Sequence, residues 1–178
     1  VTAQEHAVPS SMLAMIKYIK AEKNDYEQLI AVNSGNIKES EERLKRYNLS
    51  DIQIITRDDE KYLKSLSEAE YIFSHCGLEY YFAAKNNQKY FNLQTDNISA
   101  KMTRKKEREC FEFATVQKSI ITPKASIYLT NESRLSFEKA YRCEMLPTSA
   151  IISDSPAFDM AGATNFASST DKIKILFT

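Results

Sequence analysis

Short apolar runs alternate with amphipathic stretches along most of the chain. The run QLIAV (28–32) is typical of a buried strand, and the stretch NIKESEERLKRYN (36–48) is typical of a helix. In that helix, Ile37, Leu44 and Tyr47 are predicted to face inward. The same alternation predicts further strands at 51–56, 70–75, 88–94, 125–130 and 149–153, and further helices at 57–69, 77–86, 103–119 and 131–144.

Strands that alternate with helices predict a parallel sheet, because each crossover connection lays a helix over the sheet. We therefore expect an α/β fold, a Rossmann-like parallel sheet of about six or seven strands with helices on both faces. In the helix at 57–69, Tyr62, Leu63 and Leu66 are predicted to face inward.

Length and composition fit one ordinary globular domain. The chain has 178 residues, of which 43% are hydrophobic and 27% are charged. Lys plus Arg and Asp plus Glu both number 24, so the formal net charge is zero. Nucleic-acid binding usually needs a strongly basic face, so we expect no nucleic-acid partner. The basic run KMTRKKER (101–108) is interpreted as the solvated start of a helix rather than a phosphate or anionic-lipid contact.

Several classes of protein and cofactor are disfavoured. The cysteines Cys76, Cys110 and Cys143 are far apart and odd in number, which fits neither a disulfide framework nor a CxxC metal site. We expect reduced, partly buried thiols in a cytoplasmic protein, and no metal site.

No apolar run approaches the roughly 20 residues of a spanning helix, and the opening VTAQEHAVPSS lacks the features of a signal peptide. There is no GxGxxG or GxxxxGK[ST] pattern, so no cofactor is expected in this domain.

Function is expected in the loops after the strands, because open parallel sheets bind ligands at their carboxyl ends. These loops are Asn33–Asn36, Arg57 and Asp58, His75–Gly77, Thr95–Ser99, Thr130–Glu132 and Asp154–Ala157. Histidine titrates near neutral pH, so His75 is a candidate for acid–base chemistry; the alternative is a structural loop histidine. Tyr80, Tyr81 and Phe82 are predicted to be core residues rather than a platform for stacking sugars.

Residues 71–101, YIFSHCGLEYYFAAKNNQKYFNLQTDNISAK, resemble a segment of the CDP-glycerol glycerophosphotransferase family, which builds teichoic acids and related capsule polymers. In that family a strand is followed by a short P.YF.K helix, a Gln-x-Tyr-x-Asn strand and a Trp-His-Gly-Thr-Pro-Leu-Lys loop. This chain keeps the spacing without a gap, with Gln88, Tyr90 and Asn92 in the second strand.

The carboxyl-terminal part resembles the same family more weakly. The stretch SIYLTNESRLSFEKAY is similar to the strand and helix before the family's Gly-Tyr-Pro-Arg-x-Asp turn, and DSPAFD keeps Pro156 and Asp159 of that turn. The resemblance implies that residues 1–170 form a single Rossmann-like, acceptor-side domain, the N-terminal half of a GT-B-type architecture. Residues 171–178, DKIKILFT, would then begin a nucleotide-binding domain.

The loop after Asn92 departs from the family pattern. Gln94 stands where the family has Trp, Thr95 where it has its catalytic His, and Asp96 where it has Gly. Transfer of glycerol phosphate needs a base near the attacking hydroxyl and donors around the phosphate. Threonine cannot accept a proton at neutral pH, whereas Asp96 could, although its charge would repel the donor diphosphate unless a cation intervened. Ala157 also replaces an arginine that would suit a phosphate, so a degenerate site and a different substrate both stay open.

The resemblance thus implies a set of candidate residues and partners. The catalytic candidates are Asp96, Thr95 and His75, and the substrate-binding candidates are Asn97, Ser99, Lys101 and Asp159. The implied function is the acceptor side of a CDP-polyol phosphotransferase or glycosyltransferase-like protein of bacterial cell-surface polymer synthesis, active only within a longer chain. The alternative is a non-catalytic binding or scaffolding domain of such a protein. The expected partners are a lipid-linked or polymeric phosphate or sugar acceptor, a second Rossmann-like domain that binds the CDP-activated donor, and the inner face of the cell membrane.

Overall fold

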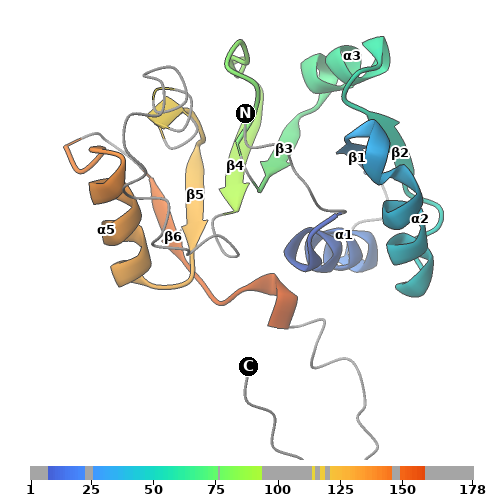
Figure 1. Ribbon diagram of the computed structural model, residues 1–178, viewed down its shortest axis with the longest axis horizontal. Helices are drawn as coiled ribbons and strands as arrows, with labels where there is room; N and C mark the ends of the chain where they lie inside the picture. The colour runs from blue at the N-terminus through green and yellow to red at the C-terminus, as the bar shows by residue number, and fades with distance from the viewer. Residues whose placement is uncertain are drawn as a thin grey trace, which may run out of the picture.

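The computed structural model describes residues 8–22, 26–75, 77–93, 114, 117, 118, 121–145 and 149–158. They form an α/β fold in which parallel strands are flanked by helices (Figure 1), which confirms the predicted fold class. The strands are β1 (Leu29–Val32), β2 (Gln53–Thr56), β3 (Tyr71–Ser74), β4 (Lys89–Leu93), β5 (Ala125–Tyr128) and β6 (Ala150–Ile152). The helices are α1 (Ser10–Glu22), the 3₁₀ helix η1 (Ser34–Asn36), α2 (Ile37–Arg46), α3 (Glu60–Glu68) and α5 (Asn131–Ala140).

The strands of the described residues form two hydrogen-bonded ladders rather than one continuous sheet. β1 pairs with β2, and β3, β4, β5 and β6 pair in that order, with every pair parallel. In Figure 1 the β1–β2 pair lies beside the β3 edge of the larger sheet. Tyr26, just before β1, packs its ring edge-on against Tyr71 at the start of β3, with the ring centroids 5.9 Å apart. This contact joins the two ladders near their amino ends.

The first core lies between the β1–β2 ladder and the helices α1 and α2. Ile37 and Tyr47 pack against this core, so the predicted inward face of α2 is confirmed. The hydrophobic pattern does not predict α1, because its apolar residues run consecutively from Met12 to Ile16 and form no single stripe. The buried members of the first core are Val8, Leu13, Ala14, Ile30, Val32, Leu44, Leu49 and Ile52.

The second core lies between α3 and the strands β3 and β4. Ile72 and Tyr90 are partners in the parallel register, and both are buried. Tyr62 is buried and Leu66 packs against this core, but Leu63 is 52% exposed, so its predicted inward position is wrong. Successive helical residues are rotated by about 100°, so a stripe through Tyr62 and Leu66 leaves Leu63 at its solvent edge.

The segment 77–86 is not the helix that the pattern predicts. It contains one turn in which the backbone N–H of Phe82 donates to the Glu79 carbonyl at 2.9 Å, and a second turn begins at Lys85, whose carbonyl accepts from the Gln88 N–H at 3.0 Å. Short segments gain little from forming a helix on their own. Phe82 is buried, but Tyr80 and Tyr81 are 57% and 53% exposed, so the prediction that all three are core residues is wrong for the two tyrosines.

The helix α5 packs beside β5. Its first turn is fixed by a reciprocal capping box, in which Thr130 Oγ1 accepts from the Ser133 N–H at 3.0 Å and Ser133 Oγ accepts from the Thr130 N–H at 3.2 Å. The rings of Tyr128 and Phe137 pack edge-on with centroids 6.1 Å apart. Cys143, just beyond the helix, is fully buried rather than partly buried, and it has no disulfide partner among the described residues.

Candidate functional site

Most of the residues predicted from the family resemblance lie outside the residues that the structure describes. Those outside are Gln94, Thr95, Asp96, Asn97, Ser99, Lys101 and Asp159, together with Cys76, Cys110, the segment 171–178 and most of the helix predicted at 103–119. The structure therefore leaves these assignments as predictions. Among the candidate catalytic and substrate-binding residues, the described part of the chain contains His75.

His75 lies directly after β3 and is 9% exposed. The preceding residue, Ser74, donates its hydroxyl to the Gly77 carbonyl at 2.7 Å, which folds the chain back on itself after the strand. Gly77 has a φ of 85°, a conformation that glycine adopts readily and that makes this tight return feasible. Because its side chain is largely enclosed, His75 offers a substrate little access, as expected for a structural loop histidine.

The motif residues Gln88, Tyr90 and Asn92 lie in β4 or next to it and are all buried. Asn92 is fully buried and stands in register with Ser74 of β3 and Ser126 of β5. A row of small polar side chains therefore crosses three strands of the larger sheet, at the carboxyl end of β3, near that of β4 and in the first half of β5. This position suits residues that support a site from beneath rather than residues that meet a ligand.

Gln88 connects the end of α3 to the start of β4. Its Nε2 donates to the carbonyls of Leu66 at 2.8 Å and Ala69 at 2.9 Å, with the Ser67 carbonyl at 3.4 Å. Its Oε1 accepts from the Lys85 N–H at 3.1 Å. The last carbonyls of a helix have no partner within the helix, so the Gln88 side chain caps the carboxyl end of α3. This motif residue therefore holds α3 in place beside β3 and β4.

A group of polar side chains lies where β2 and β3 end. Arg57 follows β2, and its backbone N–H donates to the Val32 carbonyl at the end of β1 at 3.0 Å. Its Nη1 lies 3.4 Å from Oε1 of Glu79, which belongs to the loop after β3. Tyr62, in the first turn of α3, donates its hydroxyl to Oε2 of the same carboxylate at 2.7 Å. One carboxylate therefore joins the loops that follow two strands.

The Arg57–Glu79 ion pair is well shielded from solvent. The two side chains are 24% and 22% exposed. The Nε of Arg57 is enclosed and has no hydrogen-bond partner within the described residues, and the guanidinium carbon lies 6.0 Å from the centroid of the Tyr62 ring. Burial, and then the hydrogen bond and charge of Glu79, raise the pKa of Tyr62 well above its ordinary value. The Tyr62 hydroxyl therefore stays a donor at neutral pH.

Tyr80 and Tyr81 extend this group to the surface. Their rings meet edge-on at 78°, with centroids 5.4 Å apart, and both are more than half exposed. Burial and then the charge of Glu79 raise the pKa of Tyr81, while Arg57 acts in the opposite direction, which puts the phenol within electrostatic reach of the ion pair. We call Arg57, Tyr62, Glu79, Tyr80 and Tyr81 the carboxyl-edge cluster.

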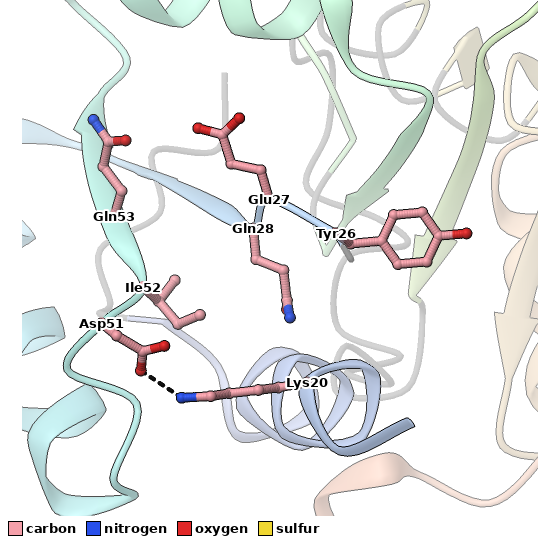
Figure 2. A pocket seen from close by; sticks show the side chains of 7 residues that line it. All are labelled: Lys20, Tyr26, Glu27, Gln28, Asp51, Ile52 and Gln53. Carbon is pink, nitrogen blue, oxygen red and sulfur yellow. Dashed lines mark hydrogen bonds and ion pairs between the residues drawn. The ribbon is translucent and has the colours of Figure 1, made fainter. Parts of the chain in front are cut away.

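A hollow of about 340 Å³ lies at the opposite, amino-terminal ends of β1 and β2 (Figure 2). Figure 2 shows Lys20 of α1 reaching Asp51, with which it forms an ion pair. The hydrogen bond from Lys20 lowers the pKa of Asp51. Because parallel sheets place ligands at their carboxyl ends, the carboxyl-edge cluster is the better candidate site. The hollow is lined by Lys20, Tyr26, Glu27, Gln28, Asp51, Ile52 and Gln53.

Within the described ranges, no three His, Cys, Asp or Glu side chains come together as a metal site. No helix in that part of the chain is long and apolar enough to cross a membrane. No protein-family model matches the sequence, and no similar curated protein is found. The family resemblance therefore rests on the motif residues quoted above.

Proposed function

We propose that the chain is the acceptor-side domain of a CDP-polyol phosphotransferase-like protein of cell-surface polymer synthesis. The observation that carries the proposal is the gap-free match of residues 71–101 to the family segment, with Tyr90 and Asn92 on β4, which runs parallel to β3, and Gln88 directly before that strand. A following domain would bind the CDP-activated donor, and a lipid-linked or polymeric acceptor would bring the protein to the inner face of the membrane. The turn at Tyr80 and Tyr81 departs from the family pattern, which has a short helix there.

The contacts of the motif residues support this proposal. Gln88 caps α3, and Asn92 is fully buried on an inner strand of the larger sheet, so both belong to the frame of the sheet. The chain keeps the family residues at these framing positions and differs from the family at Thr95 and Asp96, where the chemistry would occur. A domain that keeps these buried structural residues and differs in the catalytic loop could still position an acceptor. Proton abstraction would then fall to Asp96.

A second candidate function is a non-catalytic binding or scaffolding domain in the same kind of protein. The burial of His75 favours it, because a residue that is 9% exposed gives an acceptor hydroxyl poor access to its imidazole. In that case the domain would hold the acceptor, and the chemistry would belong to another part of the assembly.

Donor turnover by the full-length protein tests the proposed function. CMP release would be measured with CDP-glycerol and with CDP-ribitol in the presence of a lipid-linked acceptor, for the parent and for Asp96→Asn, Thr95→Ala and the control Asp154→Asn. Asp154 is an exposed carboxylate in another loop that follows a strand. If Asp96 is the base, Asp96→Asn lowers the rate by about 100-fold or more while the control retains it.

The other outcomes separate the two candidates. Release that persists in Asp96→Asn would refute the role of Asp96 as the base. A folded protein that releases no CMP from either donor but still binds the acceptor would favour the binding domain. A folded protein that neither turns over a donor nor binds the acceptor would contradict both functions.

A further inference from the structure

We propose that the carboxyl-edge cluster binds a neutral sugar or polyol, with Tyr80 and Tyr81 as the stacking surface and Arg57 and Glu79 as hydrogen-bonding partners of its hydroxyls. The inference rests on the contacts of these described residues and goes beyond the proposed transferase function, which depends on a different loop.

Two adjacent tyrosines form the exposed aromatic part of the cluster. Apolar side chains in a turn are normally buried or scattered singly, yet Tyr80 and Tyr81 are adjacent and are 57% and 53% exposed. Their rings are nearly perpendicular, so they present two differently oriented aromatic faces. The face of an aromatic ring is electron-rich and attracts the weakly positive C–H groups on the flat side of a sugar ring. Tyrosine also has few rotatable bonds, so ordering it on binding costs little entropy.

The ion pair supplies the polar half of the site. A hydroxyl group both donates and accepts, and here Glu79 can accept while Arg57 can donate. The Arg57–Glu79 contact is long, at 3.4 Å, and the two side chains are 24% and 22% exposed, so the solvent-facing atoms of the pair can still bond to a ligand. Of two neighbouring hydroxyls on a sugar, one can donate to the Glu79 carboxylate while the other accepts from the Arg57 guanidinium.

The charge balance indicates that the ligand is neutral. Arg57 and Glu79 compensate one another, and the neighbouring side chains of Asp58 and Asp59 are exposed carboxylates. A phosphate or carboxylate ligand would be repelled by these two carboxylates, and the ammonium of Lys118, which donates to the Tyr80 carbonyl, offsets only one of the two charges. Sugar hydroxyls carry no charge and avoid this repulsion.

Parts of the cluster are held in place before any ligand arrives. The Tyr62 hydroxyl fixes Glu79 at 2.7 Å, and Lys118 donates to the Tyr80 carbonyl. Side chains that are fixed in advance lose less freedom on binding, which favours affinity. The location at the carboxyl ends of β2 and β3 is also where parallel sheets place their ligands.

The test is saturation-transfer NMR and calorimetry on the full chain with four probes: chitobiose, cellobiose, maltotriose and ribitol. We expect at least one probe to bind, and each of Tyr80→Ala and Tyr81→Ala to weaken it about tenfold, the order seen for other flat ligands stacked on aromatic side chains. Tyr80→Phe keeps the ring and should bind within about threefold of the parent, a shift below 1 kcal/mol. Glu79→Gln loses acceptor charge and should weaken binding.

Tyr18→Ala is the matched control, because Tyr18 is 65% exposed on α1 and lies outside the cluster. Each variant would be checked for an unchanged thermal transition. Absence of binding by all four probes, or equal effects of Tyr18→Ala and Tyr80→Ala, would overturn the proposal. Binding of cytidine or inorganic phosphate at these tyrosines in place of the probes would also overturn it. Because no donor is present, the result is independent of CMP release, so either proposal can fail while the other holds.

Discussion

Replacing Gln88 with alanine should loosen the contact between α3 and the start of β4. The side chain is 8% exposed, and its amide makes two short donated bonds, at 2.8 and 2.9 Å, and one accepted bond, at 3.1 Å. The contact to the Ser67 carbonyl, at 3.4 Å, adds little because it is long and the amide has only two hydrogens to donate. Alanine removes all of these bonds at once and leaves their partners in a place that water reaches poorly.

The size of the effect follows from the three good bonds. A hydrogen bond within a protein contributes about 0.5–1.5 kcal/mol net, so the loss should reduce the free energy of unfolding by about 2–4 kcal/mol. For a chain of this length, each kcal/mol shifts the thermal midpoint by roughly 2–4 °C. The expected loss in the free energy of unfolding is a large part of the roughly 5–15 kcal/mol that stabilises a typical domain.

Urea unfolding followed by circular dichroism is the assay, because the chain contains no tryptophan for fluorescence. The control is Gln53→Ala, which removes an exposed glutamine from β2 and should change the free energy of unfolding by less than about 0.5 kcal/mol. Gln88→Glu keeps the shape but turns a carboxylate oxygen toward carbonyl oxygens, so it should be at least as destabilising at neutral pH. If Gln88→Ala unfolds at the same urea concentration as Gln53→Ala, the capping role of Gln88 is refuted.

Three smaller effects are expected elsewhere. Thr130→Ala removes a helix cap and should cost about 1 kcal/mol in urea unfolding; an unchanged midpoint would contradict the capping box. Lys20→Met removes the hydrogen bond that lowers the pKa of Asp51, so this pKa should rise toward 3.8 in an NMR titration. Because the lowered pKa stabilises the fold above the unfolded-state pKa and this stability is lost as the pH falls, the variant should also lose less stability in acid. A pKa that stays low would assign the shift to another group. Burial raises the pKa of Tyr128 to about 12, so the stability that this shift contributes is complete below pH 10 and is lost as the pH rises toward 12. Tyr128→Phe should make the free energy of unfolding fall less steeply over this pH range, and an unchanged slope would contradict the raised pKa.

The sequence predicts the strands well, for a physical reason. Most strands contain a short run of apolar residues that is buried, and burial of a short run between polar flanks leaves few alternatives to a strand in a parallel sheet. The exception is β6, in which Ile151 and Ile152 are 44% and 47% exposed. The helix α1 is missed because its apolar residues from Met12 to Ile16 do not form a stripe. Leu63 is misplaced because periodicity fixes the centre of an inward face better than its edge.

The candidate site is predicted in part. The rule that ligands lie at the carboxyl ends of strands selects the loops that contain Arg57 and His75. It does not show that Arg57 meets Glu79, because that contact joins residues 22 positions apart in the chain. The sequence does not predict the exposure of Tyr80 and Tyr81 either, because three adjacent aromatic residues are typical of a core. Their exposure follows from the turn at 79–82, which buries Phe82 and leaves both tyrosines at the surface.

Hydrogen exchange measured by mass spectrometry tests whether this domain meets its acceptor at the carboxyl ends of its strands. The full-length protein would be compared with and without the lipid-linked acceptor used for donor turnover. We expect slower exchange in the peptide that covers 94–101, which holds the acceptor-binding candidates, and in the peptides that cover 57–62 and 77–82, which hold the carboxyl-edge cluster. Slower exchange confined to the peptides around Lys20 and Gln53, which line the hollow at the amino ends of the strands, would contradict it.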